Sequence, residues 1–163
     1  MTEYCLAQAN IARMLAPPDD PLLADFVAQL DRINALAENS PGFVWRYVSD
    51  ARKAEYREYD DPMLLFNMSV WESAEHLYDY AYRSAHAQVF ADRRKWFEKL
   101  EQPQVALWWV PAGHIPAVAE AKERLDLITK MGPNPRAFTF RVRYDVDGKL
   151  IEAKKPVSQP AAA

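Results

Sequence analysis

Residues 63–71, MLLFNMSVW, constrain the fold of this chain more than any other stretch of it. Side chains alternate between the two faces of a strand, and here one face is entirely apolar. That face carries Leu64, Phe66, Met68 and Val70. The opposite face mixes apolar and polar side chains and carries Leu65, Asn67, Ser69 and Trp71. Neither face is plainly suited to solvent, so the sequence predicts a sheet that is covered on both sides.

Hydrophobic periodicity and turn residues divide the rest of the chain into strands and helices. Strands are predicted at residues 3–10, 42–50, 63–71, 103–113 and 137–145. Helices are predicted at residues 21–38, 72–100 and 116–131, and the long second helix contains neither Gly nor Pro. The first six elements follow the order β-α-β-β-α-β, which is the ferredoxin-like split βαβ arrangement. The predicted fold class is therefore α+β: an antiparallel sheet with two helices on one face, extended by a third helix and a last strand.

The first two helices leave the second face of this sheet uncovered. A second copy of the chain would cover it, giving a homodimer in which two sheets pack face to face as a barrel across a two-fold axis. In the alternative, the helix at residues 116–131 and the last strand fold back over that face. Residues 1–150 are predicted to form one domain, and the polar residues 151–163 are predicted to form a disordered tail.

The composition excludes several classes of partner and cofactor. The net charge of the 163 residues is −3 and Lys and Arg are dispersed, so we expect no nucleic acid partner. The four glycines form neither of the glycine-rich phosphate-binding motifs. The single cysteine, Cys5, cannot form an intrachain disulfide, which favours a reducing compartment. Because there is no signal peptide and no apolar run of about 20 residues, we expect a cytoplasmic protein that makes no contact with a membrane.

Two stretches resemble a known superfamily. Residues 67–86, NMSVWESAEHLYDYAYRSAH, resemble the passage from the third strand to the second helix in the dimeric α+β barrel superfamily. That superfamily includes antibiotic-biosynthesis-type monooxygenases and haem-degrading monooxygenases. Residues 106–141, ALWWVPAGHIPAVAEAKERLDLITKMGPNPRAFTFR, resemble a narrower bacterial family within it that is catalogued only as a domain of unknown function. The resemblance implies a dimeric α+β barrel fold and leaves the activity open.

The resemblance also points to particular residues. The haem-degrading relatives use an asparagine on the first strand, an aromatic residue near the second helix, and a histidine on that helix as the iron ligand. The matching positions in this chain are Asn10, either Tyr80 or Trp71, and His86. The resemblance therefore implies haem as one alternative, whereas the other relatives oxidise electron-rich rings without a cofactor.

The residues around His86 allow two interpretations. On a continuous helix His86 falls within an apolar, largely aromatic sector, with Asp79 and Arg93 each seven residues away along the same line. In the first interpretation these side chains are simply hydrogen-bonded to polar groups of the sheet. In the second they line a pocket between helix and sheet, where His86 acts as an acid and base or as a ligand.

The sequence-based candidates follow from the second interpretation. The candidate catalytic residues are His86, Arg93 and Asn10, and no metal site is expected. The candidate substrate-binding residues are Trp45, Trp71, Tyr82, Phe90, Trp108, Trp109, His114 and Asn67. Trp108 and Trp109 are neighbours on one strand, so they must point to opposite faces of the sheet.

Three functional hypotheses remain open at this point. The first is a homodimeric small-molecule enzyme with a hydrophobic, aromatic-lined pocket, of the cofactor-free monooxygenase type, with His86 as acid and base. The second is a haem-binding or haem-degrading protein with His86 as axial ligand. The third is a non-catalytic dimer that binds a metabolite, which a closed and filled space between helix and sheet would favour.

Overall fold

The computed structural model describes residues 3–48, 59, 61–101 and 104–153. Its main sheet has four antiparallel strands in the order β2-β3-β1-β4. The strands are β1 (Tyr4–Arg13), β2 (Phe43–Arg46), β3 (Leu64–Trp71) and β4 (Val105–Pro111). This strand order is that of a ferredoxin-like sheet, so the predicted α+β fold class is confirmed.

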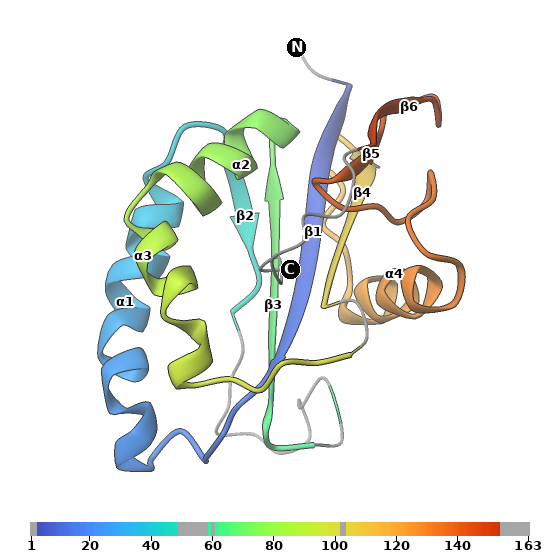
Figure 1. The fold of residues 1–163 in the computed structure, drawn as a ribbon. Helices are drawn as coiled ribbons and strands as arrows, with labels where there is room; N and C mark the ends of the chain where they lie inside the picture. Colours follow the sequence, from blue (N-terminus) through green and yellow to red (C-terminus); the bar gives the residue numbers. More distant parts are fainter. Residues whose placement is uncertain (1–2, 49–58, 60, 102–103, 154–163) are drawn as a thin grey trace.

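Helices cover both faces of this sheet. The helices are α1 (Ala24–Glu38), α2 (Ala74–Arg83), α3 (His86–Ala91) and α4 (Val118–Met131), with short 3-10 turns η1 (Pro21–Leu23) and η3 (Arg93–Lys95). Figure 1 shows α1, α2 and α3 on one side of the sheet and α4 on the other. No helix among the described residues is long and apolar enough to cross a membrane.

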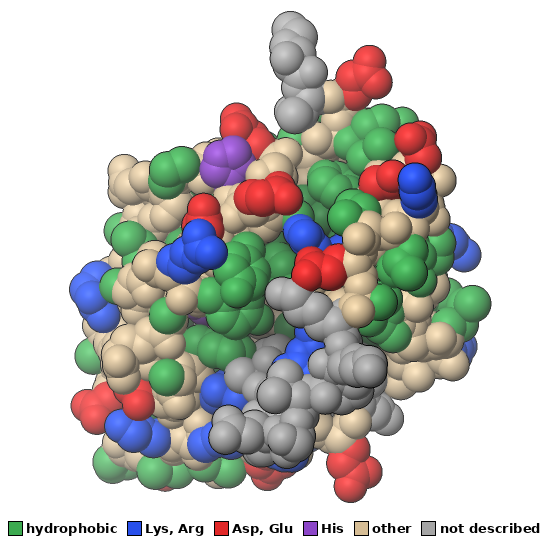
Figure 2. Space-filling view, turned by 45° about the horizontal axis from the view of Figure 1, so that its top comes forward, with side chains coloured by type: hydrophobic (Ala, Val, Ile, Leu, Met, Phe, Trp, Pro, Cys, Tyr) green, Lys and Arg blue, Asp and Glu red, His purple; other side chains and the backbone are tan. Residues whose placement is uncertain are grey.

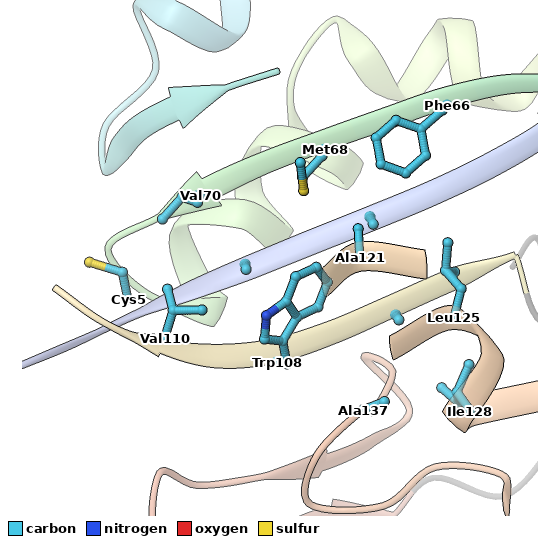
Figure 3. Packing of buried hydrophobic residues seen from close by; sticks show 13 residues of the cluster. Cys5, Phe66, Met68, Val70, Trp108, Val110, Ala121, Leu125, Ile128 and Ala137 are labelled. Carbon is cyan, nitrogen blue, oxygen red and sulfur yellow. The ribbon is translucent and has the colours of Figure 1, made fainter. Parts of the chain in front are cut away.

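The core on the α4 side follows from the alternation of side chains along the strands. Ala7 of β1 lies directly between Val70 of β3 and Trp108 of β4, and all three are buried. Figure 3 shows these strands packing against Ala121 and Leu125 of α4. The faces predicted for residues 63–71 are confirmed by this arrangement.

The position of α4 bears on the predicted homodimer. Most side chains of β1, β3 and β4 on the α4 side are at most 7% exposed within a single chain, and Ile11, which packs against them, is half-buried. In the alternative prediction, the helix at 116–131 and the last strand both fold over this face. The helix is observed there, as α4. An uncovered face is therefore no longer a reason to expect a second copy, and the homodimer remains a prediction.

The prediction of one continuous helix over residues 72–100 is wrong. Helix α2 ends at Arg83, and Ser84 has an extended backbone with φ −103° and ψ −176°. The Ser84 hydroxyl donates to the Tyr80 carbonyl and accepts from the His86 amide at 3.2 Å. The hydroxyl thus replaces the backbone hydrogen bonds of a continuous helix and caps α3, which changes the direction of the chain.

The end of this region is not helical either. Beyond η3, Phe97 forms an antiparallel bridge with Met14. The Leu15 amide donates to the Trp96 carbonyl, and the Glu98 amide donates to the Arg13 carbonyl, both at 2.8 Å. These residues therefore extend alongside the end of β1.

The last predicted strand, residues 137–145, is only partly a strand. Phe138 exchanges two backbone hydrogen bonds with Leu107, each 2.8 Å long, on the edge of β4. The chain then forms a separate hairpin of β5 (Val142–Tyr144) and β6 (Leu150–Ala153). Strand β6 runs three residues past the predicted domain end at 150, and residues 154–163 of the predicted tail lie outside the described residues.

Candidate functional site

A row of polar side chains crosses the helix-facing side of the sheet. Gln8 Nε2 donates to Asn67 Oδ1 at 2.9 Å and to Ser69 Oγ at 2.8 Å. Asn10 Nδ2 donates to Gln8 Oε1, and Trp71 Nε1 donates to Ser69 Oγ, both at 2.9 Å. Gln8 and Ser69 are each only 7% exposed, so these hydrogen bonds offset the cost of burying two polar groups.

The outer end of this row is open. Asn10 and Asn67 lie directly opposite each other on β1 and β3. Asn67 is exposed although β3 is an inner strand and this face is covered by helices, so the helices leave this part of the sheet accessible. Within the described ranges, Asn10 Oδ1 and Asn67 Nδ2 form no hydrogen bond. An acceptor and a donor are therefore presented side by side.

Four aromatic rings form a stack from the sheet outward to α3. Trp71 stacks on Tyr80 with ring centroids 5.0 Å apart, and Tyr80 lies 4.9 Å from the ring of His86. The His86 ring in turn lies 6.4 Å from Phe90. The two alternatives that the sequence offered for the aromatic position, Trp71 and Tyr80, thus belong to one stack that ends at His86 and Phe90.

Tyr80 is held firmly in this stack. Its hydroxyl donates to the Ile33 carbonyl of α1 at 3.3 Å. Burial raises the pKa of Tyr80 to about 12, and nearby Arg46 opposes this only in part. Tyr80 therefore remains a neutral phenol at physiological pH and joins α2 to α1.

His86 has its two ring nitrogens in different surroundings. Nδ1 lies 3.0 Å from the Ala81 carbonyl, which can only accept, so Nδ1 carries the proton of the neutral ring. Burial lowers the pKa of His86, and the hydrogen bond to Ala81 opposes this shift in part. In the part of the chain that the structure describes, Nε2 has no hydrogen-bond partner. His86 is therefore a neutral imidazole with a free lone pair on Nε2.

The predicted polar line through Asp79, His86 and Arg93 is not formed. The carboxylate of Asp79 is exposed and pairs with Arg83 at 3.3 Å. Arg93 donates to the Phe90 carbonyl at 2.9 Å, and its guanidinium carbon lies 4.5 Å from the centre of the Phe90 ring. The break at Ser84 is the cause, because the line required a continuous helix.

Four of the eight candidate substrate-binding residues belong to this region. They are Asn67, Trp71, Tyr82 and Phe90. Tyr82 connects to the stack through Phe90, whose ring centroid lies 5.7 Å away, and to Phe140 at the same distance. Burial raises the pKa of Tyr82, as does Tyr78, whereas Arg141 and Arg93 act to lower it.

The other four lie elsewhere. Trp45 and Trp108 pack on the α4 side of the sheet, opposite His86. His114 is exposed and pairs with Glu120 at 2.8 Å, and the same carboxylate accepts from Trp108 Nε1 at 2.8 Å. Trp109 lies on the face of the sheet that α1, α2 and α3 cover, but its ring packs on Phe138 and its Nε1 donates to the Tyr144 carbonyl. The sequence placed Trp108 and Trp109 on opposite faces, and this is confirmed.

Two residues of the site were not foreseen from the sequence. Gln8 is the buried centre of the polar row. The sequence feature that could have identified it is a polar side chain on the same strand face as the apolar Leu6. Arg141, in the segment after Phe138, acts to lower the pKa of Tyr82, and no spacing in the sequence relates it to α2.

Residues within the described ranges line two hollows of interest on the surface. A hollow of about 130 Å³ is lined by Ser40, Pro41, His76, Asp79, Tyr80 and Ser84. A more open one of about 500 Å³ lies along α4 and is lined by Ala119, Lys122, Glu123, Asp126, Leu127, Lys130 and Arg136. Neither includes His86, so the pocket expected between helix and sheet remains a prediction.

Comparison with known proteins gives a family and three distant structural likenesses. The family model described as Domain of unknown function (DUF3291) matches residues 5–154. No curated protein sequence matches the chain. Among solved structures, the PA3566 protein from Pseudomonas aeruginosa is 11% identical with a TM-score of 0.48, covering 70% of this chain and 99% of that one.

Two further structures are similar to a comparable degree. The NE2512 protein of unknown function from Nitrosomonas europaea is 15% identical with a TM-score of 0.46, covering 72% of this chain and 99% of that one. A candidate antibiotic biosynthesis monooxygenase from Chloroflexus aurantiacus is 16% identical with a TM-score of 0.42, covering 70% of this chain and 98% of that one. All three are matched almost over their full length, whereas this chain extends beyond them.

Proposed function

The chain belongs to the DUF3291 domain family, and we propose that it binds a small hydrophobic aromatic compound beside His86 and acts on it by acid–base chemistry without a cofactor. The observation that carries this proposal is the state of His86. A neutral imidazole with Nδ1 fixed by a carbonyl and Nε2 free is the form that a general base requires.

The polar row supports a binding role for the same region. Asn10 and Asn67 present an acceptor and a donor at the accessible part of the helix-facing side. Phe90 and Tyr82 provide aromatic surface beside His86. A few placed polar groups among aromatic side chains are typical of small-molecule sites. In this proposal Asn10 orients the substrate, and Arg93 stabilises the negative charge that forms on it.

The proposed reaction is oxygenation of an electron-rich ring system, as the resemblance to cofactor-free monooxygenases implies. His86 Nε2 takes a proton from an acidic ring CH₂ group, and the resulting carbanion reacts with O₂. The CH₂ group becomes a carbonyl, one oxygen atom enters the product, and the other leaves as water. O₂ is the oxidant and takes up the four electrons that the carbon loses.

A hydroxyanthrone is a suitable probe of this reaction because it contains such a CH₂ group. Absorbance and an oxygen electrode would follow its conversion to the hydroxyanthraquinone with wild-type protein, His86→Gln and His76→Gln. We expect His86→Gln to be slower by at least about a hundredfold, the contribution of a general base. His76 is bonded to Ser73 at the start of α2, so His76→Gln is the matched control. Equal rates for wild type and His86→Gln would refute the role of His86.

Haem is a second candidate, because the hydrogen bond from Nδ1 to a backbone carbonyl is also the usual outer contact of a ligand histidine. His86 would hold the iron through Nε2, and Arg93 would pair with a propionate. Bound haem would supply oxygen activation. A Soret band that appears on haemin titration and is lost in His86→Ala would favour this candidate. The absence of the band would remove it.

The homodimer is retained as part of the proposal. The edge strand β2 exposes Val44, and Val48 beyond it is 69% exposed, so apolar surface is available at this edge for a second copy. Light scattering should give twice the 18.7 kDa of one chain. A mass of one chain across the accessible concentrations would contradict it.

A further inference from the structure

Two arginines beside the candidate site lack an acidic partner. Arg93 and Arg141 are both half-buried, and neither forms an ion pair within the described ranges. Three other half-buried arginines pair with carboxylates, whereas Arg124 donates to the Arg136 carbonyl; the three pairs are Arg13 with Asp61, Arg46 with Glu38, and Arg143 with Glu152. A half-buried guanidinium without a counter-charge is costly, and an anion from outside the chain would compensate it.

Tyr82 lies between two aromatic rings that are each associated with one of these arginines. The ring of Tyr82 contacts Phe90 on one side and Phe140 on the other, with each pair of centroids 5.7 Å apart. Arg93 lies over the Phe90 ring, and Arg141 follows Phe140 in the chain. Both guanidinium groups act on the same phenol, since both favour a lower pKa of Tyr82. Arg93 therefore stands at the Phe90 side of Tyr82, and Arg141 belongs to the segment that places Phe140 on the other side.

The neighbourhood of Tyr82 is aromatic. Tyr78 packs against Tyr82 at 4.8 Å and against Phe140 at 5.6 Å. The Tyr82 hydroxyl forms no hydrogen bond to any residue that the structure describes, so it is a third free donor. Figure 2 shows hydrophobic side chains gathered near the centre of one face, bordered by charged side chains of both signs, Lys and Arg among them. Three donors among aromatic rings suit a ligand that is itself aromatic and negatively charged.

We propose that Arg93, Arg141 and the Tyr82 hydroxyl bind the anionic group of an aromatic ligand, while Phe90 and Phe140 contact its ring. The inference deepens the proposed function and rests on it in one respect: Phe90 also contacts His86, so the bound ring would lie next to the base. The substrate class is then an aromatic carboxylate or another aromatic anion.

A pair of fluorescent probes separates the charge from the ring. The anion 8-anilinonaphthalene-1-sulfonate and the neutral N-phenyl-1-naphthylamine share one ring system and differ by the sulfonate. Both would be titrated against wild type, Arg93→Gln, Arg141→Gln and the control Arg94→Gln, whose arginine is exposed next to Arg93. We expect each of the first two variants to weaken binding of the sulfonate about tenfold, as loss of a charged hydrogen bond does. Binding of the neutral probe should change by less than about twofold in all variants.

The inference is wrong if the sulfonate shows no saturable binding to wild type, or if its Kd is the same in wild type and both variants. It also falls if the neutral probe loses as much affinity as the anion. Arg141→Lys, which keeps the charge, should retain part of the affinity, and circular dichroism with thermal melting verifies that each variant is folded. The readout is binding and not turnover, so it stands or falls separately from the His86→Gln experiment.

Discussion

At the scale of single residues, His86 links the candidate site to the stability of the protein. Burial lowers its pKa in the folded state, so the folded chain resists protonation of this ring. The unfolded chain has an ordinary histidine pKa of about 6.5 and takes up the proton more readily. The contribution of His86 to the free energy of unfolding is therefore greatest above this pKa and falls as the pH drops below it.

Urea denaturation at about pH 7.5 and about pH 5 tests this linkage, since the window lies below the unfolded pKa of histidine. We expect the wild type to lose stability between the two conditions and His86→Gln to lose less. The lowered pKa values of Asp61 and Asp92 keep both carboxylates ionised at the lower pH, so they do not confound the comparison. An equal loss in wild type and variant would show that His86 is not the buried group described.

Gly42 is a second residue whose role is local and testable. Its φ is +79°, and a Cβ placed there would lie 2.2 Å from the Cγ of His76. Gly42→Ala should therefore combine backbone strain of about 1–2 kcal/mol with a steric clash. Gly113→Ala is the matched control, because φ is +91° and nothing lies within 4 Å of the added carbon. In thermal unfolding Gly42→Ala should be clearly the less stable of the two, and similar melting temperatures would contradict the contact with His76.

At the scale of elements, the break between α2 and α3 depends on Ser84. Ser84→Ala removes the hydroxyl that caps α3 and should lower the free energy of unfolding by about 1 kcal/mol. Hydrogen exchange at the His86 amide should become faster. Thr129→Ala is the control, because Thr129 bonds to the Leu125 carbonyl within a continuous helix. If His86 exchange is unchanged in Ser84→Ala, the hydroxyl does not define the start of α3.

The same element shows where reading the sequence succeeds and where it fails. Alternation along β3 correctly separated the side chains that face α4 from those on the opposite face, because one set is entirely apolar and the other includes polar side chains. The break at Ser84 was missed because serine interrupts a helix only when its hydroxyl finds a backbone partner, and neither Gly nor Pro marks the place. A register irregularity between Phe43 and Trp45 likewise puts these two side chains on opposite faces. A bulge of this kind has no signal in a strand of four residues.

At the scale of the whole molecule, α4 makes the sheet a layer between two layers of helices. The sequence predicted that both faces need cover, but alternation alone cannot tell which helix covers which face. For this reason Trp45 and Trp108 were grouped with His86 although they lie on the far side of the sheet. Asn10, Asn67, Trp71 and Phe90 do lie on the same side of the sheet as His86, and their grouping as a site remains a prediction.

The contribution of α4 to the core can be measured directly. Leu125 is 3% exposed and packs against the sheet, so Leu125→Ala should cost about 2–5 kcal/mol, as for a buried leucine elsewhere. Met131, on the same helix, is 67% exposed, and Met131→Ala should change stability by less than about 0.5 kcal/mol. The shift of the urea midpoint, at an unchanged m-value, would report the change in stability of each variant. A cost below about 1 kcal/mol for Leu125→Ala would mean that α4 is not part of the folded core.

The order of the strands has a consequence for biosynthesis. Strand β1 is made first, yet its two neighbours in the sheet, β3 and β4, are made much later. A nascent chain that has released β3 can pair one edge of β1 but must keep the other edge open until Val105–Pro111 emerges. An open inner edge is a template for pairing with other chains. Ribosomes that stall before β4 should therefore yield products that need chaperones or are degraded.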